Sequence, residues 1–192
     1  MIQIAGATRL FFAFPASPET AFHYYSGLVD RLADFLPHIE RVQVHAPRQF
    51  RMCYQATELG AYDVRMFCDV VVDRDPGSLT LTVRPETVSL PLPNRASLYA
   101  TTGPALYFSQ SIFRPDGDQT QVEYSLDLRA QLPVPHSLRI MPVRVVDGIA
   151  NAITERRIRE IAAGFIAGSR AHFAGGGEKG CGWLGAIAPT QP

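Results

Sequence analysis

A long proline-free segment near the C-terminal end of the chain constrains its fold more than any other feature. Between Pro142 and Phe173 no proline interrupts the sequence, and apolar residues recur at helical spacing. These residues are Val146, Ile149, Ile153, Ile158, Ile161 and Phe165. The segment from Phe50 to Leu132 instead has the pattern of consecutive strands. Neither a helix stripe nor a sheet face is stable alone, so we expect the helix to lie across the sheet and leave a pocket between them.

Alternating apolar residues define the strands that we expect to face this helix. Inward rows are predicted for residues 62–73 and 121–130. Their members are Tyr62, Val64, Met66, Cys68, Val70 and Val72 in the first row, and Val122, Tyr124, Leu126 and Leu128 in the second. Further strands are predicted at Thr8–Phe14, Glu40–His45, Gln49–Thr57, Ser78–Val83 and Ala105–Phe113. An early helix is expected to begin with Ser17 as N-cap and Pro18 as first residue, and to end near Asp34.

The two strands on either side of Gly60 form a predicted hairpin whose register follows from its apolar faces. Matching these faces sets Phe50, Met52, Tyr54 and Ala56 opposite Val70, Cys68, Met66 and Val64. In this register Cys68 points inward and Cys53 points outward, so the two thiols cannot form a disulfide. We expect both thiols to be reduced, which is typical of a cytoplasmic protein.

Composition and charge narrow the classes of protein that the chain can represent. It has 192 residues, of which 46% are hydrophobic, and its formal net charge is zero. Without an overall positive field, a nucleic-acid partner is disfavoured. No apolar run reaches the roughly 18 residues that a membrane-spanning helix needs. We expect one α+β domain over residues 1–174 and a Gly-rich, mobile tail over residues 175–192.

The sequence contains no motif that specifies a reaction. G-x-S-x-G, P-loop and G-x-G-x-x-G motifs are absent, although a nucleophile triad stays open because its members need not be close in sequence. Five histidines lack the spacing of metal ligands: His23, His38, His45, His136 and His172. We therefore expect no metal and no cofactor, and binding is expected rather than catalysis.

Arginines gather on the long C-terminal segment, at Arg156, Arg157, Arg159 and Arg170. Two glutamates lie among them, so ion pairs such as Glu155–Arg159 are available at i, i+4 spacing. The first interpretation is therefore a solvated, salt-bridged helix face. The alternative is contact with the anionic head group of a lipid or with a ligand carboxylate.

The order strand, helix, antiparallel strands and long C-terminal helix resembles the helix-grip fold of the START/polyketide-cyclase superfamily, also called SRPBCC. The resemblance is carried by Tyr25, Leu32, Leu36, Pro37, the stretch Leu126–Pro135, and the 142–173 helix with Gly148 and Asn151. The sequence is most similar to a bacterial and plastid branch of that superfamily whose function is uncharacterised. The resemblance implies no catalytic residues. It implies a cavity between sheet and helix of the kind that holds lipids, sterols, quinone-like or polyketide molecules.

We expect this cavity to be lined by Met66, Cys68, Tyr124, Leu126 and Phe165. Its candidate polar rim consists of Tyr62, Tyr107 and Arg65, although strict alternation turns Arg65 outward. The simpler interpretation of each tyrosine is a packed aromatic ring with a backbone partner for its hydroxyl.

Three functions are compatible with these features. The leading hypothesis is non-catalytic binding or carriage of a small hydrophobic molecule. The second is an aromatase/cyclase-type enzyme that acts on a polyketide-like substrate. The third is an interaction scaffold whose cavity is filled by its own side chains. The sequence predicts no oligomeric state.

Overall fold

A computed structural model of the chain describes residues 1–87 and 91–176, and it has the α+β architecture predicted from the sequence. The strands are β1 Ile2–Phe14, β2 Ile39–Ala46, β3 Gln49–Glu58, β4 Tyr62–Asp75, β5 Thr80–Pro85, β6 Arg95–Ala96, β7 Ala100–Asp116 and β8 Gln119–Leu132. The helices are α1 Pro18–Gly27 and α2 Val143–Ala174, with 3₁₀ segments η1 Leu28–Phe35 and η2 His136–Leu138. The predicted tail lies outside the described residues from position 177 onward.

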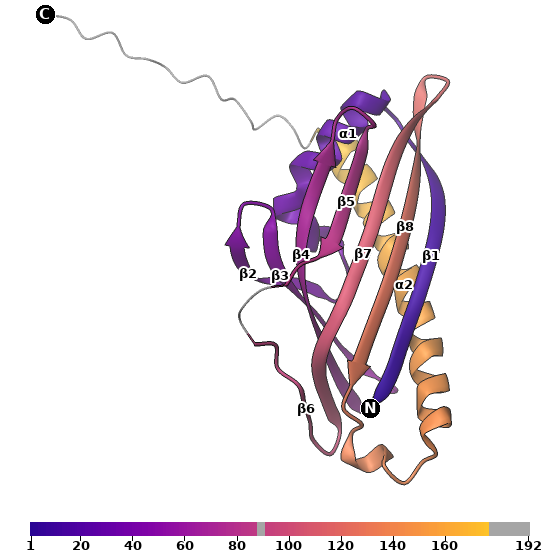
Figure 1. Ribbon diagram of the computed structural model, residues 1–192. Helices are drawn as coiled ribbons and strands as arrows, with labels where there is room; N and C mark the ends of the chain where they lie inside the picture. Colours follow the sequence, from indigo (N-terminus) through magenta and orange to yellow (C-terminus); the bar gives the residue numbers. More distant parts are fainter. Residues whose placement is uncertain (88–90, 177–192) are drawn as a thin grey trace, which may run out of the picture.

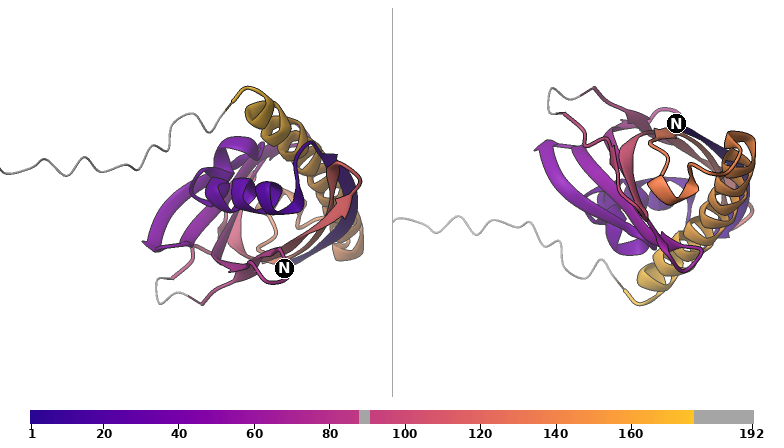
Figure 2. Two further views of the ribbon diagram at one scale, coloured as in Figure 1. Left: turned by 90° about the horizontal axis from the view of Figure 1, so that it is seen from above. Right: turned by 90° about the horizontal axis from the view of Figure 1, so that it is seen from below.

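The strands form one curved sheet in the order β1-β8-β7-β5-β4-β3-β2, with the short β6 added beside β7. The sheet wraps around α2, which runs across its concave side, as the views along the molecule show (Figures 1 and 2). Pairing is antiparallel except where β5 has ended, since there β4 and β7 pair in parallel from Asp63 and Ala100 onward. The prediction of a curved antiparallel sheet on a long C-terminal helix is therefore confirmed.

The predicted register of the β3–β4 hairpin is confirmed residue by residue. Met52 lies opposite Cys68 and Tyr54 lies opposite Met66, with the remaining pairs following in step. Cys68 thus belongs to the inward row, whereas Cys53 lies opposite Phe67 on the other face. One-residue slips are disfavoured because they would turn a buried apolar row outward.

Helix α1 begins as expected but does not continue to Asp34. The hydroxyl of Ser17 accepts a hydrogen bond from the backbone N–H of Thr20 at 3.3 Å, and Pro18 occupies the first turn. After Gly27 the chain tightens into η1. Glycine lowers helix propensity, and Pro37 disfavours a helical residue before it, so a short 3₁₀ segment replaces the last predicted turns.

Helix α2 packs most closely on β1, the edge strand. A Cβ placed on Gly6 would lie 2.5 Å from Cδ1 of Ile158, so any other residue here would require the Ile158 side chain to move. The side chains of Asp147 and Asn151 accept hydrogen bonds from the backbone N–H groups of Gln3 and Ala5, at 2.9 and 3.0 Å. These contacts satisfy donors that an edge strand would otherwise leave unpaired.

An aromatic cluster fills one end of the space between the sheet and α2. It consists of Phe14, Phe22, Tyr24, Tyr25, Phe113, Phe165 and Phe173. The hydroxyl of Tyr24 donates to the carbonyl oxygen of Ser169 at 2.7 Å, and the hydroxyls of Tyr25 and Ser169 are 3.0 Å apart. This cluster ties α1 to the C-terminal half of α2 and closes the space at that end.

Candidate functional site

The other end of the same space holds a cavity of about 150 Å³. It lies beside Ile2 and Ile4, at the opposite end of β1 from Phe14. Its wall comes from β1, β2, β3, β4, β7, β8, η2 and α2. It is mostly aliphatic: Ile2, Ile4, Leu36, Ile39, Met52, Val64, Met66, Leu126, Leu128, Leu132, Val146, Ile149, Ile153, Ile158 and Ile161. A cavity of this size with such a lining accommodates a single aromatic ring.

The cavity reaches the surface between the β3–β4 hairpin and α2. Leu59 at the hairpin tip and Ile149 on α2 both belong to its lining, yet they are 64% and 38% exposed. The remaining wall residues named above are buried or half-buried. We call this gap between the hairpin and α2 the entrance of the cavity.

Five of the eight predicted site residues line the cavity: Tyr62, Met66, Cys68, Tyr107 and Leu126. The other three do not. Phe165 belongs to the aromatic cluster, where its ring packs on Tyr25 at a centroid distance of 5.7 Å. Arg65 is exposed, as strand alternation requires. Tyr124 is placed next to Tyr107 rather than on the wall itself.

A pair of tyrosine hydroxyls lies beside the cavity, between β7 and β8. The hydroxyl oxygens of Tyr107 and Tyr124 are 3.0 Å apart, and of the two residues Tyr107 belongs to the cavity wall. Burial raises the pKa of both phenols above their ordinary value. Both tyrosines are therefore neutral hydrogen-bonding groups at physiological pH.

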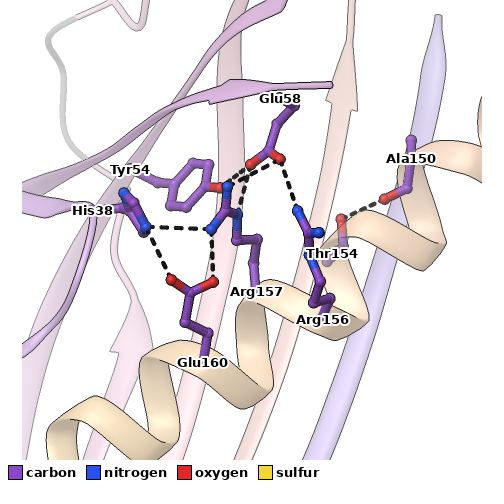
Figure 3. A network of polar contacts seen from close by, with 8 residues as sticks. All are labelled: His38, Tyr54, Glu58, Ala150, Thr154, Arg156, Arg157 and Glu160. Carbon is purple, nitrogen blue, oxygen red and sulfur yellow. Dashed lines mark hydrogen bonds and ion pairs between the residues drawn. The ribbon is translucent and has the colours of Figure 1, made fainter. Parts of the chain in front are cut away.

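A charged network crosses the entrance (Figure 3). Arg157 on α2 donates to both carboxylate oxygens of Glu58 at the end of β3, at 2.9 and 3.2 Å. The hydroxyl of Tyr54 donates to the same carboxylate at 2.6 Å, and Arg156 approaches it at 3.6 Å. Since Glu58 and Arg157 both line the cavity, this pair joins the hairpin to the helix across the entrance.

The network continues outward through Glu160 and His38. Arg157 also donates to Glu160 at 2.6 Å, and the Nε2 atom of His38 lies 3.3 Å from the same carboxyl group. Burial alone would raise the pKa of Glu58, but donation by Arg157 and Tyr54 outweighs it, and the pKa is lowered. Hydrogen bonding to Glu58 and Glu160 raises the pKa of the Arg157 guanidinium. The Glu58–Arg157 pair is therefore fully ionised at neutral pH.

Glu58 and Arg157 were not predicted as site residues. The arginine cluster predicts a solvated helix face for Arg157, whereas its side chain is only 17% exposed and belongs to the cavity lining. Two sequence signals indicate that Glu58 and Arg157 face the cavity. Glu58 continues the inward parity of Tyr54 and Ala56, and Arg157 lies midway between Ile153 and Ile161 at i, i+4 spacing.

The described side chains provide few groups for covalent or metal chemistry. Within residues 1–87 and 91–176, no group of three histidine, cysteine or acidic side chains could hold a metal ion. Burial raises the pKa of the Cys68 thiol to about 12, so this cavity-lining cysteine is protonated at neutral pH. None of the described helices is long and apolar enough to cross a membrane.

Comparison with known proteins identifies the fold. No family model and no curated protein matches the sequence. Among solved structures, TTHA0849 from Thermus thermophilus superposes with a TM-score of 0.54 at 16% identity, over 89% of this chain and 99% of that one. The Zhui aromatase/cyclase from Streptomyces sp. R1128 gives 0.51 at 10% identity, over 88% and 96%. The di-domain ARO/CYC StfQ from the steffimycin biosynthetic pathway gives 0.51 at 15%, over 91% and 52%.

These similarities show that the chain has the helix-grip fold of these proteins. The predicted resemblance to the START/polyketide-cyclase superfamily is thus confirmed at the level of architecture. Identities of 10–16% carry the fold alone. The finer resemblance to the bacterial and plastid branch stays a prediction, since no family model matches.

Proposed function

We propose that the protein binds a small hydrophobic molecule, without converting it, in the cavity between the sheet and α2. The observation that carries this proposal is the unfilled space itself: about 150 Å³ with a mostly aliphatic wall. Packed protein interiors leave few voids larger than a water molecule. The aromatic cluster fills the neighbouring space with the chain's own side chains, so the empty end argues against the scaffold hypothesis.

The cavity volume limits the size of the molecule. Pockets for drug-sized ligands occupy about 300–1,000 Å³. The present cavity matches one aromatic ring or a short acyl chain, whereas a sterol would require the wall to move. We therefore expect small aromatic or short-chain ligands to bind most tightly.

An aromatase/cyclase-type activity is the second candidate. It is supported by the buried hydroxyl pair of Tyr107 and Tyr124 and by the structural similarity to two aromatase/cyclases. Binding alone leaves a ligand chemically unchanged. Mass analysis of a polyketide-like compound after incubation with the protein separates the two functions, because cyclisation with loss of water lowers the mass of the compound.

Two measurements test binding. Native mass spectrometry of the purified protein detects a co-purified ligand. A thermal-shift screen then covers small aromatics, quinones and fatty acids of several chain lengths. A ligand that binds only the folded state must raise the melting temperature. Met66→Trp should abolish the shift by filling the cavity. Leu106→Trp, at a 59% exposed position of β7, is the matched control and should retain it. Absence of any stabiliser, or equal shifts in both variants, would contradict the proposal.

A further inference from the structure

Two tyrosine hydroxyls meet beside a mostly aliphatic cavity, and this arrangement bears on what the cavity recognises. Tyr107 forms part of the wall beside Leu126 and Leu128, and its hydroxyl oxygen is 3.0 Å from that of Tyr124. Ser109, two residues further along the same strand, is only 5% exposed. Aliphatic side chains alone would be enough to pack a dry core. The tyrosine hydroxyls therefore add hydrogen-bonding groups that packing does not require.

Counting protons shows what these hydroxyls can offer. Each hydroxyl carries one donor proton and two acceptor lone pairs. The bond between Tyr107 and Tyr124 uses one proton and one lone pair, and leaves one proton and three lone pairs free. The pair can therefore donate to a carbonyl or hydroxyl oxygen, or accept from a hydroxyl, without losing its internal bond.

The residues around Tyr107 exclude a charged ligand group beside its hydroxyl. Glu58 and Arg157 are the charged residues of the described cavity wall, and they neutralise one another at the entrance. A carboxylate or ammonium beside Tyr107 would be buried without a counter-ion, which costs far more than one hydrogen bond returns. An uncharged oxygen carries no such penalty.

We infer that the ligand bears an uncharged oxygen, as a phenol, alcohol, ketone or quinone does, and that this oxygen hydrogen-bonds the Tyr107–Tyr124 hydroxyl pair. The inference rests on the proposed binding function and specifies its ligand class. The hydrophobic body of the ligand lies along the aliphatic wall, and the oxygen sets its orientation. Tyr107 and Tyr124 thus determine specificity rather than the bulk of the affinity.

Matched probes test this inference. Dissociation constants are measured by calorimetry for 4-propylphenol and for 4-propyltoluene, in which a methyl group replaces the hydroxyl. Water solvates the phenol better than 4-propyltoluene, so the two dissociation constants are not compared directly within one protein. Instead, their ratio is compared between wild-type and variant proteins. In Tyr107→Phe and Tyr124→Phe the preference for the phenol should fall by about 10-fold relative to wild type, the size of one neutral hydrogen bond. Binding of 4-propyltoluene should stay unchanged.

The controls separate the possible failures. Tyr99→Phe, at a 52% exposed position away from the cavity wall, should keep the wild-type ratio. If neither probe binds wild-type protein, the proposed function itself fails. If both probes bind and the ratio is the same in all variants, binding stands and the hydroxyl inference is overturned. Tyr107→Phe could lose binding of both probes if the cavity wall collapses. In that case Tyr124→Phe decides the outcome, because Tyr124 is not part of the wall.

Discussion

Arg157 on α2 holds the carboxylate of Glu58, 99 residues earlier in the chain, through two hydrogen bonds of 2.9 and 3.2 Å. The side chain of Glu58 is 5% exposed, so removal of its partner would leave a buried charge. Arg157→Met should lower the free energy of unfolding by about 2–4 kcal/mol. Arg156→Met removes a neighbouring, 63% exposed guanidinium and should change it by less than about 0.5 kcal/mol. Equal effects in urea unfolding would show that the entrance network is not a stabilising contact.

Two glycines of α2 should respond oppositely to alanine. A Cβ at Gly148 meets nothing within 4 Å, so Gly148→Ala should stabilise by about 0.5–1 kcal/mol through helix propensity. A Cβ at Gly164 would lie 2.7 Å from Cγ of Pro37, whose ring cannot rotate away. Overpacking of about 1–3 kcal/mol should outweigh the propensity gain, so Gly164→Ala lowers stability. Thermal melting of the two variants checks the sign, and stabilisation by both would mean that α2 does not press on Pro37.

Stability should fall on the acid side of about pH 4.5. The pKa values of Glu58 and Glu160 are lowered from their ordinary value of 4.5 in the folded protein. A lowered folded-state pKa contributes stability above the unfolded pKa, and this contribution is lost as the pH falls through the folded pKa. Glu58→Gln should therefore flatten the acid limb of the unfolding free energy against pH. Glu155→Gln, an exposed change on the same helix, is the control. An unchanged limb in Glu58→Gln would contradict the assignment.

The cysteines should all be reduced. Cys68 faces the cavity, while Cys53 lies opposite Phe67 on the other sheet face, so no bridge can join them. Thiol titration of denatured, unreduced protein should give three thiols per chain, the full cysteine content of the sequence. In native protein at pH 8, Cys68 should react slowly because burial raises its pKa to about 12. A single titratable thiol would require a bridge between Cys53 and Cys68 and a different register.

Strand alternation made most of the fold predictable from the sequence. The hairpin register was predictable because a one-residue slip would expose Met66 and Cys68. The start of β1 was not, since Ala5, Gly6 and Ala7 form a weak strand signal. Gly6 lacks a side chain at the point where Ile158 and Thr154 of α2 lie against it, and that long-range contact leaves no local pattern.

The helix face was harder to predict for a related reason. The apolar stripe predicted from the sequence includes Ile149, Ile153 and Ile161, which lie on the cavity wall. The buried residues of α2 are Val146, Thr154, Ile158, Ala162 and Ser169. Three of these five side chains are small or polar, so hydrophobic periodicity identifies only part of the buried face. The Glu58–Arg157 pair was not predicted, because charged side chains near an arginine cluster are usually solvated.

The unfilled cavity also gives the protein a mechanical property. Unfolding eliminates internal voids, so the unfolded chain with its solvent occupies less volume than the folded protein. Hydrostatic pressure should therefore unfold the empty protein more readily than a variant such as Met66→Trp that occupies the space. A seated ligand would have the same effect. The volume change on unfolding therefore measures directly whether the cavity between the sheet and α2 is empty or occupied.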